Sequence, residues 1–200
     1  MAPTLDELLI ADRPAQWAAL GFAVGEDGGC DVGEIRLQLG AGGEGIAGWA
    51  LRDVAGGPID GLHTIVSGAP RRAPAPPQPN GVIGLDHVVV ATPDVARTTS
   101  ALAAAGFELR REREAGRGKQ AFYVVGDAVL EVVGPLEPDG EGPAAFWGLT
   151  LVCADLDATC AALGEAVVGP PREAVQPGRR IATLRAAAGL GAAVALMSPR

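Results

Sequence analysis

Residues 83–94 read IGLDHVVVATPD, a stretch that combines a strand with the start of a helix. Its apolar and β-branched residues predict the strand, and the TPD that follows is typical of a helix N-terminus. One side chain that is able to bind a metal, His87, lies inside the strand. Because His63 is the only other histidine of the chain, any chemistry that needs an imidazole depends on these two residues.

The same stretch begins a pattern of five elements that extends from residue 83 to 135. A helix follows the strand and ends at Gly106, and the segments FELRRER, KQAFYVV and GDAVLEVVGP then read as three further strands. The predicted order of this unit is therefore β-α-β-β-β.

Residues 145–199 repeat that order with FWGLTLVCA, DLDATCAALG, EAVVGPPREA, GRRIATLRAA and LGAAVALMSP. The two copies come into register when Asp94 is aligned with Asp155 and Pro135 with Pro199. A curved sheet with one covering helix leaves an apolar face open, and a second copy packed against the first would close it. We therefore expect the two copies to form one domain over residues 83–199.

The segment before these copies is shorter and more acidic. A proline-rich stretch, SGAPRRAPAPPQPNG at 67–81, disfavours helix and central strand and predicts a linker. The expected division is 1–70, a linker at 71–82, and 83–199. Within 1–70, LDELL parallels LDHVV and GEIRLQLG parallels DAVLEVVG, while GIAGWALRDV and GLHTIVSGAP resemble another first and last strand. This pattern predicts degenerate, shortened versions of the same unit.

Composition narrows the classes of function. The chain has 200 residues, 48% of them hydrophobic, and a net charge of −8, which suits a globular protein and disfavours nucleic acid as a partner. The N-terminus lacks the pattern of a signal peptide, and no apolar run is long enough for a membrane span, so we expect a cytoplasmic protein with no membrane partner. The three cysteines have no metal-type spacing and are expected to be buried thiols.

The two copies resemble the vicinal oxygen chelate superfamily, which includes glyoxalase I, extradiol dioxygenases and bleomycin-resistance proteins. The resemblance rests on LDHVVVATPDV, QAFYVVGDAVLEVVGP and WGLTLVCADLDA, and it covers residues 83–199 well and 4–70 weakly. It implies an α+β fold in which paired βαβββ modules form a cupped mixed or antiparallel sheet. It also implies a divalent metal in the cup, held by side chains from the first and last strands of each module.

The resemblance places His87 on the first strand and Glu131 on the last strand of copy one at the ligand positions. In copy two the aligned positions hold Gly148 and Ala195, which have no side chain for a metal. Two ligands of four remain, fewer than the three protein ligands of a catalytic zinc site. Two roles are open for His87 and Glu131: ligands of a divalent ion (Zn, Ni, Fe or Mn), or a metal-free pair that lines a pocket.

Further candidates follow from position in the pattern. Glu7 in LDELL takes the place of His87 in LDHVV, and His63 lies on a predicted strand, so these two residues are further candidate metal ligands. Glu131 interrupts the apolar run VLEVV, where an unpartnered carboxylate would be costly, and is the candidate catalytic residue. The candidate ligand-binding residues are Gln120, Tyr123, Trp147, Arg179 and Arg180. For Phe122 two positions are open, in the pocket wall or in the hydrophobic core.

Two functions are compatible with these residues. The first is a small-molecule-binding protein of the glyoxalase or bleomycin-resistance type with an eroded metal site. The second is a metal-dependent lyase, isomerase or dioxygenase in which His87 and Glu131 hold a divalent ion and Glu131 moves a proton. Fold-level analogy alone does not decide between them. Such modules also pair between chains, so a homodimer is an alternative to pairing within one chain.

Overall fold

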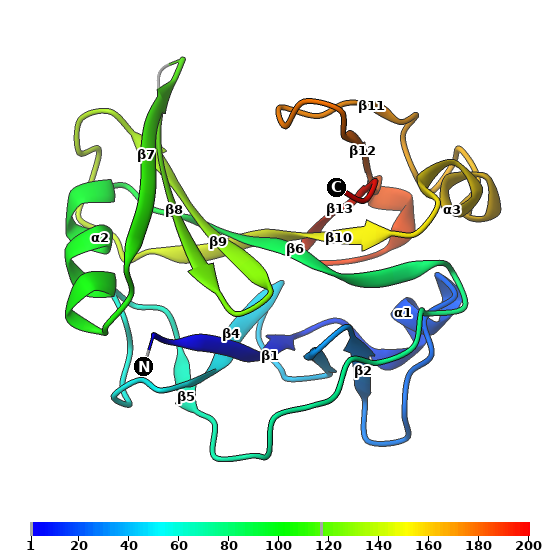
Figure 1. The fold of residues 1–200 in the computed structure, drawn as a ribbon, viewed down its shortest axis with the longest axis horizontal. Helices are drawn as coiled ribbons and strands as arrows, with labels where there is room; N and C mark the ends of the chain where they lie inside the picture. The colour runs from blue at the N-terminus through cyan, green and yellow to red at the C-terminus, as the bar shows by residue number, and fades with distance from the viewer. Residues whose placement is uncertain (1, 117) are drawn as a thin grey trace.

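The computed structural model describes residues 2–116 and 118–200, which form two mixed β-sheets of five and eight strands. In the eight-stranded sheet the strand order is β11-β12-β13-β10-β6-β9-β8-β7. The sheet is curved, and its two ends, β7–β8 and β11–β12, rise on the same side to form a cup (Figure 1).

The first half of this sheet follows the order predicted from the sequence. It consists of β6 (Val82–Ala91), α2 (Val95–Ala104), β7 (Leu109–Ala115), β8 (Gly118–Val125) and β9 (Ala128–Pro135). The Asp94 carboxylate caps α2 by accepting a hydrogen bond from the Arg97 backbone N–H. Strand β9 returns to lie parallel to β6, which brings the last strand of the unit beside the first.

The second half repeats the arrangement with shorter outer strands. It consists of β10 (Ala145–Cys153), α3 (Leu156–Leu163), β11 (Arg172–Glu173), β12 (Arg180–Thr183), the short 3-10 helix η1 (Ala186–Ala188) and β13 (Ala193–Met197). Strand β13 is parallel to β10, as β9 is to β6, and β10 pairs antiparallel with β6 at the centre of the sheet. The α+β fold of paired βαβββ modules is confirmed, with both modules in one chain.

The five-stranded sheet is built from the N-terminal segment. Its elements are β1 (Thr4–Ile10), α1 (Pro14–Ala19), β2 (Gly29–Val32), β3 (Ile35–Leu39), β4 (Ile46–Arg52) and β5 (Thr64–Val66). Its strand order is β2-β3-β1-β4-β5, with β1 parallel to β3, β1 antiparallel to β4, and β4 parallel to β5. These directions match those of β9-β6-β10-β13 in the larger sheet.

The five-stranded sheet packs against the side of the larger sheet that faces away from the cup (Figure 1). Aromatic side chains join the two layers. The fully buried Trp49 of β4 stacks on Phe107, with 5.9 Å between the ring centroids, and meets Phe146 of β10 edge-on, with 5.1 Å between the ring centroids. One hydrophobic core therefore includes residues of both sheets, and burial of these large rings stabilises the contact between them.

The proline-rich segment at 67–81 forms neither helix nor strand, and it is fastened to the five-stranded sheet. Ala75 N–H donates to the Gly33 carbonyl, and the buried Gln78 side chain donates to the Asp31 carbonyl and accepts from Ala23 N–H. The segment is therefore a bound strap and not a free connection.

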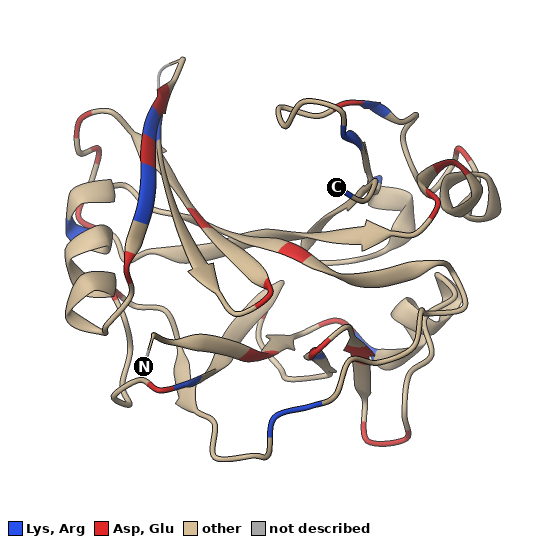
Figure 2. Cartoon of the chain, in the orientation of Figure 1, with Lys and Arg blue, Asp and Glu red and all other residues tan. Residues whose placement is uncertain are grey.

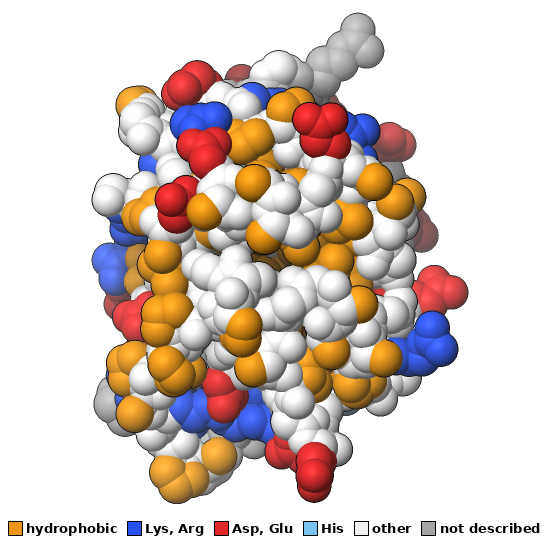
Figure 3. All heavy atoms as spheres, turned by 90° about the vertical axis from the view of Figure 1, so that its right-hand side faces the viewer, with side chains coloured by type: hydrophobic (Ala, Val, Ile, Leu, Met, Phe, Trp, Pro, Cys, Tyr) orange, Lys and Arg blue, Asp and Glu red, His pale blue; other side chains and the backbone are white. Residues whose placement is uncertain are grey.

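Charged residues lie mainly at strand ends, in loops and along β7, where basic and acidic positions alternate (Figure 2). On the face drawn in Figure 3, acidic, basic and apolar side chains are interspersed. No helix of the described residues is long and apolar enough to cross a membrane.

Candidate functional site

The cup of the eight-stranded sheet holds a cavity of about 500 Å³. One wall is formed by β7 and β8, the floor by β6, β9 and β13, and the other wall by the segment around β11 and the start of β12. The side chains on these elements that border the cavity include His87, Arg110, Arg111, Arg113, Gln120, Phe122, Val124, Val129, Glu131, Arg172, Glu173, Val175, Gln176, Ile181 and Met197. The volume is that of a site for a small organic molecule.

His87 lies on β6 at the floor of the cavity, with both ring nitrogens engaged. Nδ1 is 2.8 Å from Oδ2 of Asp86, and Nε2 is 3.0 Å from Oγ1 of Thr150 on β10. Because an ionised carboxylate only accepts hydrogen bonds, Nδ1 carries a proton and donates to Asp86; in the neutral ring the Thr150 hydroxyl would then donate to Nε2. The two contacts hold the ring in one orientation.

Asp86 owes its position beside His87 to a β-bulge. His87 pairs with Thr150 and Leu85 with Leu151, so Asp86 is an extra residue with no partner on β10. Its other carboxylate oxygen is 2.6 Å from Nη1 of the buried Arg179, whose Nε and Nη2 donate to the Ser198 carbonyl. Burial alone would raise the pKa of Asp86, but hydrogen bonds from His87 and Arg179 outweigh it and hold the pKa below its usual value.

Glu131 lies on β9 on the same face as His87. Its Oε1 accepts a hydrogen bond from Gln120 Nε2 at 2.7 Å, and its Oε2 is 3.9 Å from His87 Nε2. Burial raises the pKa of Glu131, although a protonated His87 and the positive charge of Arg113 oppose this shift. A partly buried carboxyl whose pKa is raised is able to exchange a proton with a bound molecule.

Gln120 connects Glu131 to a third strand. Its Oε1 accepts a hydrogen bond from Arg113 Nε on β7 at 2.6 Å, and the Arg113 guanidinium lies 5.4 Å from the centre of the Phe122 ring. Arg113 is not among the site residues predicted from the sequence, although the alternation of RREREA indicates it, since this pattern sends Arg111 and Arg113 to one face of the strand. Gln120 and Phe122 both border the cavity.

The second module offers no counterpart to His87 and Glu131. His87 pairs with Val129 as Gly148 pairs with Ala193, and Val89 pairs with Glu131 as Thr150 pairs with Ala195. The register therefore equates His87 with Gly148 and Glu131 with Ala195, as the sequence alignment predicted. A Cβ at Gly148 would lie 2.3 Å from the Ala193 carbonyl oxygen, so the backbone here leaves no room for a side chain.

Three of the ligand-binding residues proposed from the sequence, Trp147, Arg179 and Arg180, do not border the cavity. Tyr123 is part of the cavity lining, but its side chain is 1% exposed and packs edge-on against Phe107, whereas Phe122 faces the cup. Arg179 is buried against Asp86. Trp147 is 63% exposed and is not part of the cavity wall. Arg180 turns to α3, where it forms a partly exposed ion pair with Asp157 at 2.7 Å.

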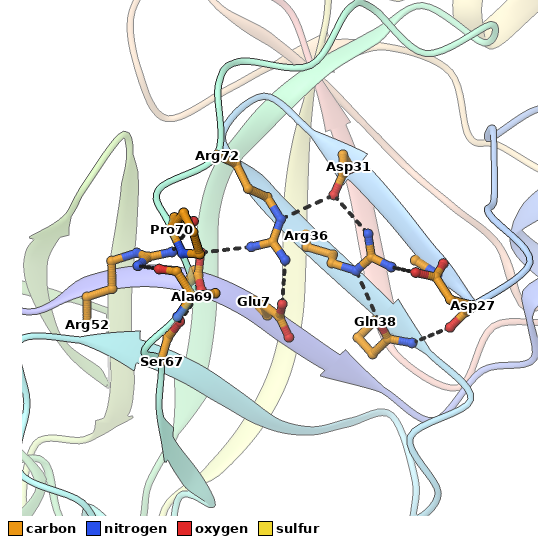
Figure 4. Close-up of polar contacts among 12 residues, drawn as sticks. Glu7, Asp27, Asp31, Arg36, Gln38, Arg52, Ser67, Ala69, Pro70 and Arg72 are labelled. Atoms are coloured by element: carbon orange, nitrogen blue, oxygen red, sulfur yellow. Dashed lines mark hydrogen bonds and ion pairs between the residues drawn. The ribbon is translucent and has the colours of Figure 1, made fainter.

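The N-terminal candidates lie in the other sheet. Glu7 accepts from Arg72 Nη2 at 2.6 Å, and Figure 4 shows Arg72 between Glu7 and Asp31. His63 packs over Gly48 of β4, and neither His63 nor Glu7 borders the cavity. Within residues 2–116 and 118–200, no group of three or more His, Cys, Asp or Glu side chains is arranged to hold a metal ion.

The paired modules, the parallel first and last strands and the central antiparallel pair define a fold of the glyoxalase, or vicinal oxygen chelate, type. No family model and no curated protein sequence matches the chain. Similar solved structures include methylmalonyl-CoA epimerase from Mycobacterium tuberculosis, with 22% identity and a TM-score of 0.49 over 60% of this chain and 90% of that one.

Two further solved structures match a comparable share of this chain. A Streptomyces coelicolor methylmalonyl-CoA epimerase in complex with 2-nitronate-propionyl-CoA has 22% identity and a TM-score of 0.47 over 58% of this chain and 94% of that one. A hypothetical protein from Bacillus halodurans has 15% identity and a TM-score of 0.47, also over 58% and 94%.

Proposed function

We propose that this protein binds a small organic molecule in the cup and does so without a tightly held metal ion. The observation that carries the proposal is the register of the two modules. It pairs the polar His87 and Glu131 of one half with Gly148 and Ala195 of the other, and Gly148 has no space for a side chain. The cup keeps a polar floor and a concave volume for a ligand.

The residues present do not fit a catalytic metal site. A zinc site of this kind uses three protein ligands, and a non-haem iron site uses two histidines and a carboxylate. His87 and Glu131 supply two ligands, and His87 Nε2 is already in hydrogen-bond contact with the Thr150 hydroxyl. The nearby Gln120 is bound to both Arg113 and Glu131. A divalent ion here would be mostly hydrated and weakly held.

Metal content tests this part of the proposal. Protein purified without chelator, and with zinc, nickel, iron and manganese each supplied during expression, is expected to contain far less than one metal ion per chain. Its melting temperature is expected not to change on addition of EDTA. Stoichiometric metal that is lost in His87→Ala would contradict the proposal and support a metal-dependent lyase, isomerase or dioxygenase.

Ligand binding in the cup is tested by a thermal-shift screen of small organic molecules against the wild type and Val129→Trp. Val129 faces the cavity from β9, so an indole at this position would fill the cup. Compounds that bind in the cup are expected to raise the melting temperature of the wild type and not that of the variant. Equal shifts in both proteins would place the binding elsewhere.

A second candidate function is a metal-free isomerase or lyase in which Glu131 transfers a proton. The raised pKa of Glu131 and its place on the cavity floor favour this candidate. Incorporation of deuterium from D2O into a panel of carboxylates and ketones with acidic C–H bonds would detect such a step. The exchange is expected to disappear in Glu131→Gln, and exchange that persists in this variant would contradict the role of Glu131.

We also propose that residues 1–70 are a shortened copy of the C-terminal pair of modules. Two features support this: the matching strand directions, and a bulge in β1 at Asp6, which stands directly before Glu7 as Asp86 does before His87. In this copy the strap at 71–82 places Arg72 against the carboxylate of Glu7 (Figure 4) and against that of Asp6. The copy would then be a structural element that supports the back of the cup.

A further inference from the structure

Strand β7 separates its charges between its two faces. Arg111 pairs with Phe122 and Arg113 with Gln120, and both of these β8 partners border the cavity. Cross-strand partners share a face of the sheet, so both arginines belong to the cup. Glu112, between the two arginines, and Glu114, after them, pair with Ala121 and Lys119 and fall on the opposite face. The cup wall therefore receives the basic residues of this strand and not its acidic ones.

Two more arginines reach the cavity. A bulge between Leu109 and Arg111 adds Arg110 to the same wall, and Arg172 of β11 lies on the wall opposite. Four arginines thus border the cavity, against two carboxylates, Glu131 and Glu173. The chain as a whole has a net charge of −8, but at physiological salt the Debye length is about 8 Å, so nearby arginines dominate the potential that a bound group experiences.

These arginines are poorly neutralised by the protein. Arg110 forms an exposed pair with Glu108 at 3.3 Å, whereas no carboxylate in the described part of the chain lies within ion-pair distance of Arg111, Arg113 or Arg172. Arg113 is nevertheless held in place, because Gln120 accepts from its Nε and Phe122 lies beneath its guanidinium. Its Nη1 and Nη2 groups make no hydrogen bond to another described residue and are free to bind a ligand.

Much of the remaining cavity lining is apolar. Phe122, Val124 and Val129 on one side and Ile181 and Met197 on the other present hydrocarbon surface around the polar centre at Glu131. We propose that the ligand of the cup is an organic oxyanion, a carboxylate or a phosphate monoester, on an apolar body. Its charged group binds Arg111 and Arg113, which match the two oxygens of such a group by bidentate hydrogen bonds. This inference rests on the proposed function.

A matched pair of fluorescent dyes tests the inference: anilinonaphthalene sulfonate, an anion with an aromatic body, and N-phenyl-naphthylamine, which has the same body without the sulfonate. Arg113→Gln and Arg111→Gln are each expected to lower the affinity for the sulfonate dye by about tenfold, the order expected for a charge-assisted hydrogen bond. Neither variant is expected to change the affinity for the neutral dye. Arg71→Gln, at an exposed arginine on the strap, is the control and is expected to change neither affinity.

Displacement of the sulfonate dye by naphthoate or by naphthyl phosphate distinguishes the two oxyanions, with naphthalenemethanol as the neutral comparison. Val129→Trp separates this inference from the proposed function. Suppose that Val129→Trp abolishes binding of both dyes while the arginine variants leave the affinity for the sulfonate dye unchanged. Binding in the cup is then supported, and the inference of an anionic ligand is wrong. If it leaves both dyes unaffected, the dyes do not bind in the cup, and both proposals are contradicted.

Discussion

Asp6 and Asp86 are each the extra residue of a β-bulge in the first strand of their sheet, and each carboxylate is buried against an arginine. Asp6 is 2.9 Å from Arg72 Nη1 and also meets Arg52 and Ser67, whereas Asp86 is 2.6 Å from Arg179 and bonded to His87. In both places one member of an adjacent arginine pair, Arg71–Arg72 or Arg179–Arg180, turns inward. The bulge directs two successive side chains to the same face, which explains why Asp86 and His87 touch.

Arg179→Met is expected to destabilise the fold by about 3–5 kcal/mol, because it leaves the Asp86 carboxylate buried without its cation. Arg180→Met is the matched control, since the Arg180–Asp157 pair is exposed and its loss is expected to leave the free energy of unfolding unchanged. Urea unfolding of both variants measures the difference. Equal effects of the two substitutions would show that the buried pair has no special weight.

Arg72→Met is expected to destabilise the protein by about 1–3 kcal/mol, less than Arg179→Met, because Asp6 keeps Arg52 and Ser67 as partners. Arg71→Met serves as the control at the neighbouring exposed arginine. If the strap fixes the five-stranded sheet as the structure indicates, backbone amides of β1 are expected to exchange with D2O faster in Arg72→Met. Unchanged amide exchange in β1 would argue against this role.

The pH dependence of stability is expected to reflect these two carboxylates. For both Asp6 and Asp86, burial raises the pKa, but hydrogen bonds and arginine charge outweigh it, so the folded pKa lies below the unfolded value of about 3.9. Their contribution is fully present above that value and is lost as the pH falls through the folded pKa. Carboxyl-carbon NMR titration is expected to give both residues a pKa below about 3.9; ordinary values would contradict the burial of these ion pairs.

The sequence predicted the pairing of modules and the equivalence of His87 with Gly148, because both depend on local patterns and on one alignment. It did not predict that Thr150 and Asp86 hold the imidazole of His87. Thr150 is on another strand, and the residue types of Leu85, Asp86 and His87 do not indicate the bulge that turns Asp86 toward His87. Tyr123 and Phe122 show the limit of alternation: one faces the core and the other the cup, and only the strand pairing fixes which.

Glu131→Gln is expected to stabilise the protein at neutral pH. Burial raises the folded pKa of Glu131 above its unfolded value of about 4.3. The wild type therefore loses stability as the pH rises from the unfolded pKa through the folded pKa, and this loss persists at every higher pH. Glutamine removes this cost and keeps an oxygen for Gln120.

The gain from Glu131→Gln is therefore expected to be present at about pH 7 and to vanish at about pH 4, as followed by urea unfolding at the two values. The control is Glu173→Gln, an exposed carboxylate on the opposite wall, which is expected to show no gain. If the gain in stability does not depend on pH, it results from packing and not from the charge of Glu131.

Gly148→Ala is expected to destabilise the fold by about 1–3 kcal/mol, because its Cβ would meet the Ala193 carbonyl oxygen at 2.3 Å and force β10 and β13 apart. Gly84→Ala, at a β6 position with no atom within 4 Å of the added Cβ, is expected to be neutral or slightly stabilising. The same contact implies that Gly148→His would not restore the ligand equivalent to His87, because the backbone would have to move first. Thermal unfolding of the two alanine variants decides the matter: if Gly148→Ala is as stable as Gly84→Ala, the absence of a second histidine has no steric basis.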